Sequence, residues 1–244
     1  MIKRILCLIC IILATGCQIG QLTTLYTDKT SFEENGIRYD ANHQPITGVY
    51  HRYSDCMRLI DEIHYVNGVI TGLYVSYNDK GNIILNGHFY NGEPHGKVII
   101  YHDNGKEKEV SYYKNGKLNN SRLFYYENGD LLRKESYKNG KKNGIFEEYY
   151  KNGAIKYSHT YKKGKQNGAQ KFYTKSNNLI SYSEYHNGRC EGTTKSFHMN
   201  GKPKVFAKCK NGKLNGKAKE FDKNGNLTKI VEYDMGKEVN NIKF

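Results

Sequence analysis

The chain has 244 residues and carries 38 Lys and Arg against 24 Asp and Glu, a formal charge of +14. Only 37% of its residues are hydrophobic, fewer than the roughly 45–50% from which ordinary layered domains build a core. The 22 Tyr and 9 Phe are too many for a disordered chain, and the 25 Gly do not follow the three-residue period of collagen, so a thin, Tyr-rich structure with many turns remains.

The N-terminal segment predicts export from the cytoplasm. Lys3 and Arg4 precede an apolar run at residues 5–13, which is shorter than the roughly 20 residues of a membrane span. A basic start, a short apolar run and small residues before a break are the parts of a secretory signal peptide. Residues 1–16 are therefore predicted to be removed as a signal peptide.

The end of this segment, Leu13-Ala14-Thr15-Gly16-Cys17, resembles the lipobox of bacterial lipoproteins, with Ala14 where Leu is usual. The resemblance implies that Cys17 is the lipidation site and the mature N-terminus. It also implies that Gln18 directs the protein to the outer membrane of the cell envelope. Two or three acyl chains would hold the protein stably at a membrane. The alternative is an ordinary signal peptide cleaved near Gly16, with Cys17 an incidental thiol.

Residues 17–43 are predicted to form the lipidated N-terminus and a polar linker, and residues 44–244 a repeat domain. Beyond Cys17, the cysteines are Cys56, Cys190 and Cys209. Cys190 and Cys209 could lie diagonally across one hairpin on the same face. A disulfide between them is possible, but two unpaired thiols fit the sequence equally well.

Glycine recurs with a strict period of 24 residues in three ladders. Asn fills gaps in the second and third ladders, and Asn tolerates positive φ better than other residues that have a side chain. The period indicates about eight copies of one supersecondary unit. The first ladder is Gly68, Gly92, Gly116, Gly140, Gly164, Gly188, Gly212 and Gly236; the second is Gly48, Gly72, Gly96, Asn120, Gly144, Gly168, Gly192, Gly216 and Asn240; the third is Gly81, Gly105, Gly129, Gly153, Asn177, Gly201 and Gly225.

Asn-Gly pairs between short runs with aromatic and β-branched residues predict hairpins, since a type I′ turn needs positive φ at two successive residues. We expect each unit to hold a strand, a tight turn such as Asn104-Gly105, a second strand and a wider Asn-Gly-Lys-x-x-Gly turn. The frequent glycines argue against helices. The predicted fold is all-β: an elongated, single-layer antiparallel meander of β-hairpins, roughly 75 Å long at about 4.8 Å between strands.

Two columns of rings follow the same period and are predicted to hold the thin layer together. Aromatic pairs between neighbouring units add about 0.5–1.5 kcal/mol each beyond burial. Such rings can also stack on sugars, but their presence in nearly every unit favours a structural role. The first column is Tyr53, Tyr77, Tyr101, Tyr125, Tyr149, Tyr173, Phe197 and Phe221; the second is Tyr65, Phe89, Tyr113, Tyr137, Tyr161, Tyr185 and Tyr233, with Cys209 in the remaining place.

One unit, Tyr137-Lys138-Asn139-Gly140-Lys141-Lys142-Asn143-Gly144 followed by Tyr149-Tyr150-Lys151-Asn152-Gly153, resembles the MORN repeat variant, which includes chains known as YwqK family antitoxins. The resemblance covers residues 44–244 and implies a hairpin-repeat fold. It implies a binding or assembly module, sometimes at membranes. It also implies an antitoxin role, with which Cys17 conflicts, because a cytosolic antitoxin would not carry a lipobox.

The positive charge is concentrated in the C-terminal half and near turns. Residues 17–115 carry nine basic and twelve acidic side chains, whereas residues 116–244 carry 27 basic and twelve acidic ones. A basic margin along one side of the sheet could attract anionic glycans or lipid head groups. Lysines in turns also keep strand-rich proteins soluble, and this solvation role is the simpler explanation. The ten candidates are Lys114, Lys117, Lys138, Lys141, Lys162, Lys165, Arg189, Lys210, Lys213 and Lys237.

No pattern predicts catalysis, a metal site or a cofactor. The nine His residues lack the spacing of metal ligands. No nucleophile elbow, phosphate-binding loop or dinucleotide fingerprint is present in the sequence. Nucleic acid is not an expected partner, because the signal peptide directs the chain out of the cytoplasm.

We therefore expect a non-catalytic, lipid-anchored protein of the bacterial cell envelope. Its repeat ribbon would be a scaffold for an unknown protein or membrane partner. One alternative is a surface adhesin that binds acidic glycans or lipid phosphates through the basic C-terminal half. Another is the antitoxin or immunity role that the resemblance implies.

Overall fold

The computed structural model describes residues 25–27 and 31–244. The predicted signal peptide, residues 1–16, and the lipidation candidate Cys17 lie outside the described residues. Within them, all regular secondary structure is β-strand. A helix long and apolar enough to cross a membrane is absent from this part of the chain.

The strands form one large sheet and one separate hairpin. From β4 onward, consecutive strands pair antiparallel along the chain, while β1 pairs parallel with β4. β12 and β13 both pair with β11, and β19 and β20 both pair with β18, so each pair is one strand in two parts. The bounds are β1 (Leu25–Thr27), β2 (Ser31–Glu34), β3 (Ile37–Asp40), β4 (Gly48–Tyr53), β5 (Leu59–Val66), β6 (Val69–Tyr77), β7 (Ile83–Tyr90), β8 (Glu93–Tyr101), β9 (Glu107–Lys114), β10 (Lys117–Tyr125), β11 (Leu131–Lys138), β12 (Lys141–Lys142), β13 (Gly144–Tyr149), β14 (Ile155–Lys162), β15 (Lys165–Tyr173), β16 (Leu179–His186), β17 (Arg189–Phe197), β18 (Pro203–Lys210), β19 (Lys213–Leu214), β20 (Gly216–Phe221), β21 (Leu227–Asp234) and β22 (Lys237–Lys243).

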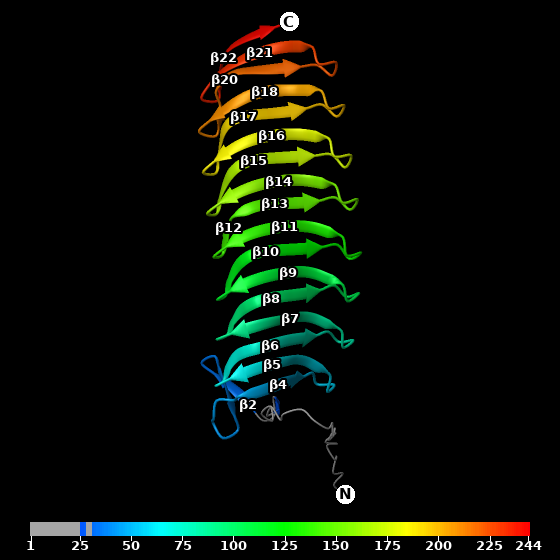
Figure 1. Cartoon of the computed structure of the whole chain (residues 1–244), viewed down its shortest axis with the longest axis vertical. Coiled ribbons are helices and arrows are strands. Elements are labelled where there is room, and N and C mark those ends of the chain that lie inside the picture. The colour runs from blue at the N-terminus through cyan, green and yellow to red at the C-terminus, as the bar shows by residue number, and fades with distance from the viewer. Residues whose placement is uncertain (1–24, 28–30) are drawn as a thin grey trace, which may run out of the picture.

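The large sheet has 20 strands and is an open layer. In the described residues β1 pairs only with β4 and β22 only with β21, so the two ends do not meet. Figure 1 shows the result, a ladder in which the strands follow one another along the long axis. The predicted all-β, single-layer antiparallel meander is confirmed.

A hairpin of β2 and β3 packs against the first repeat, within the segment that we expected to be a linker. The N–H of Arg38 donates to the carbonyl of Gly68 at 2.8 Å, and the N–H of Gly68 donates to Ile46 at 2.7 Å. The Arg38 guanidinium lies 4.3 Å from the ring centre of Tyr50. The prediction of a linker over 17–43 is therefore wrong for its last part. Among the described residues no other repeat precedes the first one, and this hairpin supplies some of the contacts that a preceding repeat would offer.

The two kinds of turn are the reverse of our prediction. Lys114 pairs directly with Lys117, so Asn115 and Gly116 alone form the loop, with φ of 48° and 70°, as a type I′ turn requires. Gly105 instead lies in a wider loop, in which its N–H donates to the carbonyl of His102 at 2.9 Å. Both turns contain Asn-Gly, and only the strand register distinguishes them.

The second glycine ladder lies inside strands, at bulges, and not in a turn. Gly144 has φ of 113°, and a Cβ atom there would come within 2.9 Å of the Cβ of Ser136. The preceding residue, Asn143, accepts a hydrogen bond through Oδ1 from the backbone N–H of Lys163 in the next tight turn, at 3.2 Å. Asn119, Asn167 and Asn215 accept equivalent bonds. Each of these Asn side chains ties a tight turn to the preceding repeat.

The two ring columns lie on opposite faces of the sheet. Phe146 lies between Tyr137 and Tyr161 of the second column, with ring centres 5.5 and 4.8 Å away. Phe206 lies between Phe197 and Phe221 of the first column in the same way. Strand registers place Phe146 and Phe206 on different faces. Rings of one column are therefore bridged by a residue of the intervening strand in these repeats.

The best-packed part of the sheet is at its N-terminal end. Ile46, Tyr50, Ile63 and Tyr65 form a buried cluster. Further along, a strand has at most two buried positions, such as Val110 and Ser111 of β9, and several strands have none. Low hydrophobic content is thus accommodated by a layer that is one strand thick.

Candidate functional site: the basic edge

All ten predicted basic residues lie on one long edge of the sheet, where each flanks a tight turn, on the left in Figure 1. We call these ten residues the basic edge. Four turns are flanked by directly paired lysines: Lys114 with Lys117, Lys138 with Lys141, Lys162 with Lys165, and Lys210 with Lys213. Successive turns are two strands apart, which is about 9.6 Å.

Packing does not account for this arrangement of charge. All ten side chains are exposed, and none is within 4.0 Å of a carboxylate oxygen in the described part of the chain. Like charges directly opposite each other destabilise a strand pair. The same positions in the first two repeats are Val66 with Val69 and Tyr90 with Glu93. The charge of this edge is therefore low in the first two repeats and higher in the following ones, and it falls again at the last tight turn, where Asp234 pairs with Lys237.

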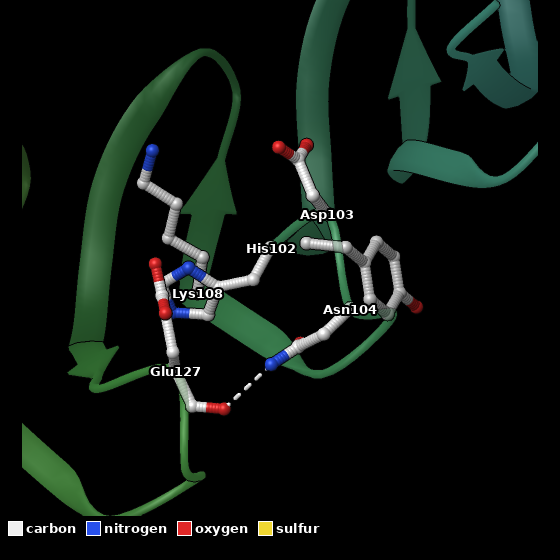
Figure 2. Close-up of a pocket in the computed structure, with 6 residues that line it drawn as sticks. His102, Asp103, Asn104, Lys108 and Glu127 are labelled. Atoms are coloured by element: carbon white, nitrogen blue, oxygen red, sulfur yellow. Dashed lines mark hydrogen bonds between the residues drawn. The ribbon is translucent and has the colours of Figure 1, made fainter. Parts of the chain in front are cut away.

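The opposite edge, formed by the wider turns, contains a hollow of about 270 Å³. Figure 2 shows Asn104 and Glu127 in it, joined where Asn104 Nδ2 donates to the Glu127 carbonyl at 2.8 Å. His102 Nε2 lies 3.0 Å from the carbonyl oxygen of Tyr125. These polar groups link one repeat to the next, so their contacts explain their presence without a ligand.

A network of ionic groups occupies the middle of one face, where sequence reasoning identified nothing. Arg122 donates to Glu109 Oε1 at 2.8 Å and Oε2 at 3.0 Å. Ser111 donates to Glu109 at 2.6 Å. Burial tends to raise the pKa of Glu109, but the hydrogen bonds from Arg122 and Ser111 outweigh it, and the pKa of Glu109 is lowered.

The network continues across Phe124 to the next hairpin. The guanidinium carbons of Arg122 and Arg133 lie 4.7 and 4.1 Å from the ring centre of Phe124. Arg133 Nε is 2.9 Å from Glu135 Oε1, but its N–H is not aimed at that oxygen and makes no hydrogen bond. These groups are partnered by one another, which indicates a structural role. They do not recur with the 24-residue period, so the repeat pattern could not reveal them.

Two tyrosines have strongly raised pKa values: Tyr157 on the face of this network and Tyr149 on the opposite face. Burial raises the pKa of Tyr149 to about 12, with help from its hydrogen bond to Glu147. Burial and Glu148 do the same for Tyr157, also to about 12. His159 has a lowered pKa because of burial and the nearby Lys142. A group of three or more potential metal ligands does not occur in residues 25–27 and 31–244.

The structure joins Cys190 and Cys209 in a disulfide, with Cα atoms 5.6 Å apart. The sequence left this pairing open. Cys56 is exposed and free. Cys209 thus fills its place in the second ring column with a covalent bond between β17 and β18.

The geometry defines the class of this protein: an open ladder of β-hairpin repeats. Comparison with known families gives the repeat type, since the family described as "MORN repeat variant" matches residues 94–115, 119–139, 142–163 and 211–235. None of the curated proteins matches the chain. Among solved structures, a chain in "Crystal Structure of TcdB2-TccC3-Cdc42" is 9% identical with a TM-score of 0.22; the match covers 82% of this chain and 13% of that one. A TM-score this low does not show that the two chains share a fold.

Proposed function

We propose that this protein is a non-catalytic repeat scaffold, held at the bacterial outer membrane through lipid on Cys17, that presents the basic edge to an acidic partner. The observation that carries the proposal is the basic edge itself. Ten exposed cations, which form no ion pair with a carboxylate of the described residues, recur along one side of the ladder. Such a row attracts extended anions, whose own charges also repeat along their length.

The disulfide between Cys190 and Cys209 supports an exported location. Disulfides persist in oxidising compartments such as the periplasm and the cell surface, and are rare in the cytosol. This agrees with a signal peptide at residues 1–16. The lipobox-like sequence that ends at Cys17 supplies the anchor in this proposal.

Replacing the proposed lipid attachment site tests the anchor. Cys17→Ser should move the protein from the membrane fraction to the soluble fraction and remove the acyl mass from its N-terminal peptide. Cys56→Ser, which removes an exposed free thiol, is the matched control and should leave both unchanged. A Cys17→Ser protein that remained acylated and membrane-bound would contradict the anchor.

A second candidate, an adhesin for acidic glycans or lipid phosphates, is favoured by the lysines of the same edge, whose charges no carboxylate of residues 31–244 neutralises in an ion pair. Retention on immobilised heparin should be strong at low salt and weak at high salt. Charge reversal of Lys117, Lys141, Lys165 and Lys213 to Glu should abolish it. Reversal of four exposed lysines in the wider turns, Lys80, Lys151, Lys175 and Lys223, is the control for net charge. Equal loss in both variants would show that position on the edge does not matter.

A further inference from the structure

The basic edge contains a hollow between the tight turns that follow β16 and β18. The hollow has a volume of about 570 Å³ and is lined by Lys165, His186, Arg189, Glu191, Lys210 and Asn211. Its three cations come from three consecutive tight turns. The hollow is therefore lined by cations from three repeats.

Most of the hydrogen-bonding capacity of these cations is free. Glu191 is the one carboxylate in the lining, and its Oε2 accepts the backbone N–H of Asn211 at 2.7 Å. No ion pair within 4.0 Å joins Lys165, Arg189 or Lys210 to a carboxylate in the described residues. The three cations and Glu191 leave the lining with a net positive charge.

This turn also differs from its neighbours in residue type. The residue after the turn glycine is Arg189 here and Lys in five other tight turns. The residue before the two turn residues is His186 here and Lys in four other tight turns. A guanidinium offers two parallel N–H donors to one anion, which an ammonium cannot do. The imidazole of His186 can add a further donor. The hollow is thus chemically distinct from the rest of the basic edge.

The disulfide fixes the separation of β17 and β18, the two strands that carry Arg189 and Lys210. Cys190 follows Arg189, and Cys209 precedes Lys210. The Cys190–Cys209 bond holds the Cα atoms of those cysteines 5.6 Å apart. Successive strand residues point to opposite faces, so the sulfur atoms and the two cations do not compete for space. Less conformational freedom is then lost on binding.

We propose that this hollow binds a phosphate monoester carried on a larger molecule. Such a group has two negative charges and several peripheral oxygens, so Arg189 can hold two oxygens while Lys165 and Lys210 neutralise the remainder. A carboxylate would use Arg189 alone. The volume exceeds that of one phosphate group, which leaves room for the sugar or glycerol that carries it. The inference rests on the proposed role of the basic edge and names its ligand chemistry.

Isothermal titration calorimetry of the mature chain with glucose 6-phosphate and with glucuronate tests the inference. We expect glucose 6-phosphate to bind at least tenfold more tightly than glucuronate. Arg189→Lys, which keeps the charge, should weaken glucose 6-phosphate binding by roughly five- to tenfold. Lys117→Ala, at an equivalent position two repeats before Lys165, should change it less than twofold. Phosphatidic acid in phosphatidylcholine vesicles presents the same phosphate monoester on a lipid, and vesicles of phosphatidylcholine alone are the control.

The outcomes separate the hollow from the edge as a whole. Weaker binding of Arg189→Lys to glucose 6-phosphate or to the phosphatidic acid vesicles supports the hollow as the binding site. Which of the two ligands is affected shows whether a sugar or a lipid carries the phosphate. Equal effects of Arg189→Lys and Lys117→Ala, or no preference over glucuronate, would overturn it. If heparin retention still fell on charge reversal of the edge, the proposed function would stand without this site. Circular dichroism of both variants checks that the sheet is intact.

Discussion

Tyr126 donates its phenolic hydrogen to the carbonyl oxygen of Tyr149 at 2.9 Å, across the boundary between two repeats. Tyr150 makes the same bond to Tyr173 at 2.9 Å, and His198 Nε2 lies 2.9 Å from the carbonyl oxygen of Phe221. In each case the residue after a ring of the first column contacts the backbone of the next ring in that column. The Tyr-Tyr pairs therefore combine one ring that packs with one hydroxyl that links repeats.

Removal of that hydroxyl should weaken the contact between two repeats. Tyr126→Phe should lower the free energy of unfolding by about 1 kcal/mol, the net value of a typical hydrogen bond. Tyr125→Phe is the matched control, because the Tyr125 hydroxyl has no hydrogen-bond partner among the described residues. Urea unfolding followed by circular dichroism measures both. Equal destabilisation by the two changes would contradict the role assigned to Tyr126.

Lys163 occupies a turn position that most other repeats give to Asn, and its φ is 51°. Residues other than Gly, Asn and Asp are strained in this left-handed region. Lys163→Asn should therefore stabilise the protein by about 0.5–1 kcal/mol, as conformationally matched turn substitutions do.

Lys162→Asn provides the control for Lys163→Asn. It removes the same charge from the adjacent strand residue, which is also exposed but has no positive φ. Thermal unfolding should show a higher Tm for Lys163→Asn only. A similar increase in both variants would assign the gain to reduced charge repulsion.

The repeat period and the all-β ladder could be predicted because conformation repeats with sequence. Gly116 and its equivalents have positive φ in every repeat, and this requirement is visible in a single chain. The kind of turn could not be predicted, since Asn104-Gly105 and Asn115-Gly116 are the same dipeptide and differ in strand register. Register depends on pairing across the sheet, as between Lys114 and Lys117.

The site was predictable only in part, for the same reason. The alignment of Lys117, Lys141 and Lys165 on one edge follows from the period. The network around Arg122 does not repeat, so its contacts depend on the particular neighbours of Glu109 and Phe124. The hollow at Arg189 combines residues from three turns with a disulfide that the sequence left open.

Reduction of the Cys190–Cys209 disulfide should destabilise the C-terminal repeats. The bond closes a loop with a sequence separation of 19, for which chain entropy gives a contribution of about 3 kcal/mol. Addition of reductant should lower the Tm of the wild type but not that of the Cys190→Ser, Cys209→Ser double variant. Because neighbouring repeats can unfold without the rest of the ladder, the rate of amide hydrogen exchange should rise most in β17 and β18. An unchanged Tm and exchange pattern would show that the bond contributes nothing to stability.

Glu109 should make the middle of the sheet sensitive to acid. Its pKa is lowered from the ordinary value of 4.5 in the folded protein, so the unfolded chain takes up the proton first as pH falls. The resulting stability is fully present above about pH 4.5 and is lost as pH falls through the lower folded pKa. Glu109→Gln should cost about 1–3 kcal/mol at neutral pH, because Arg122 loses its charged partner, and should flatten the fall in Tm below pH 4.5.

The control for the acid prediction is Glu107→Gln, which removes a carboxylate two residues away. Glu107 is 41% exposed and lies 3.4 Å from Lys97, so its loss should cost less than about 1 kcal/mol. Glu148 also has a lowered pKa and titrates in both variants, so the difference between their Tm curves isolates Glu109. If Glu109→Gln kept the acid-dependent fall of the wild type, the bond from Arg122 would not be the cause of that dependence.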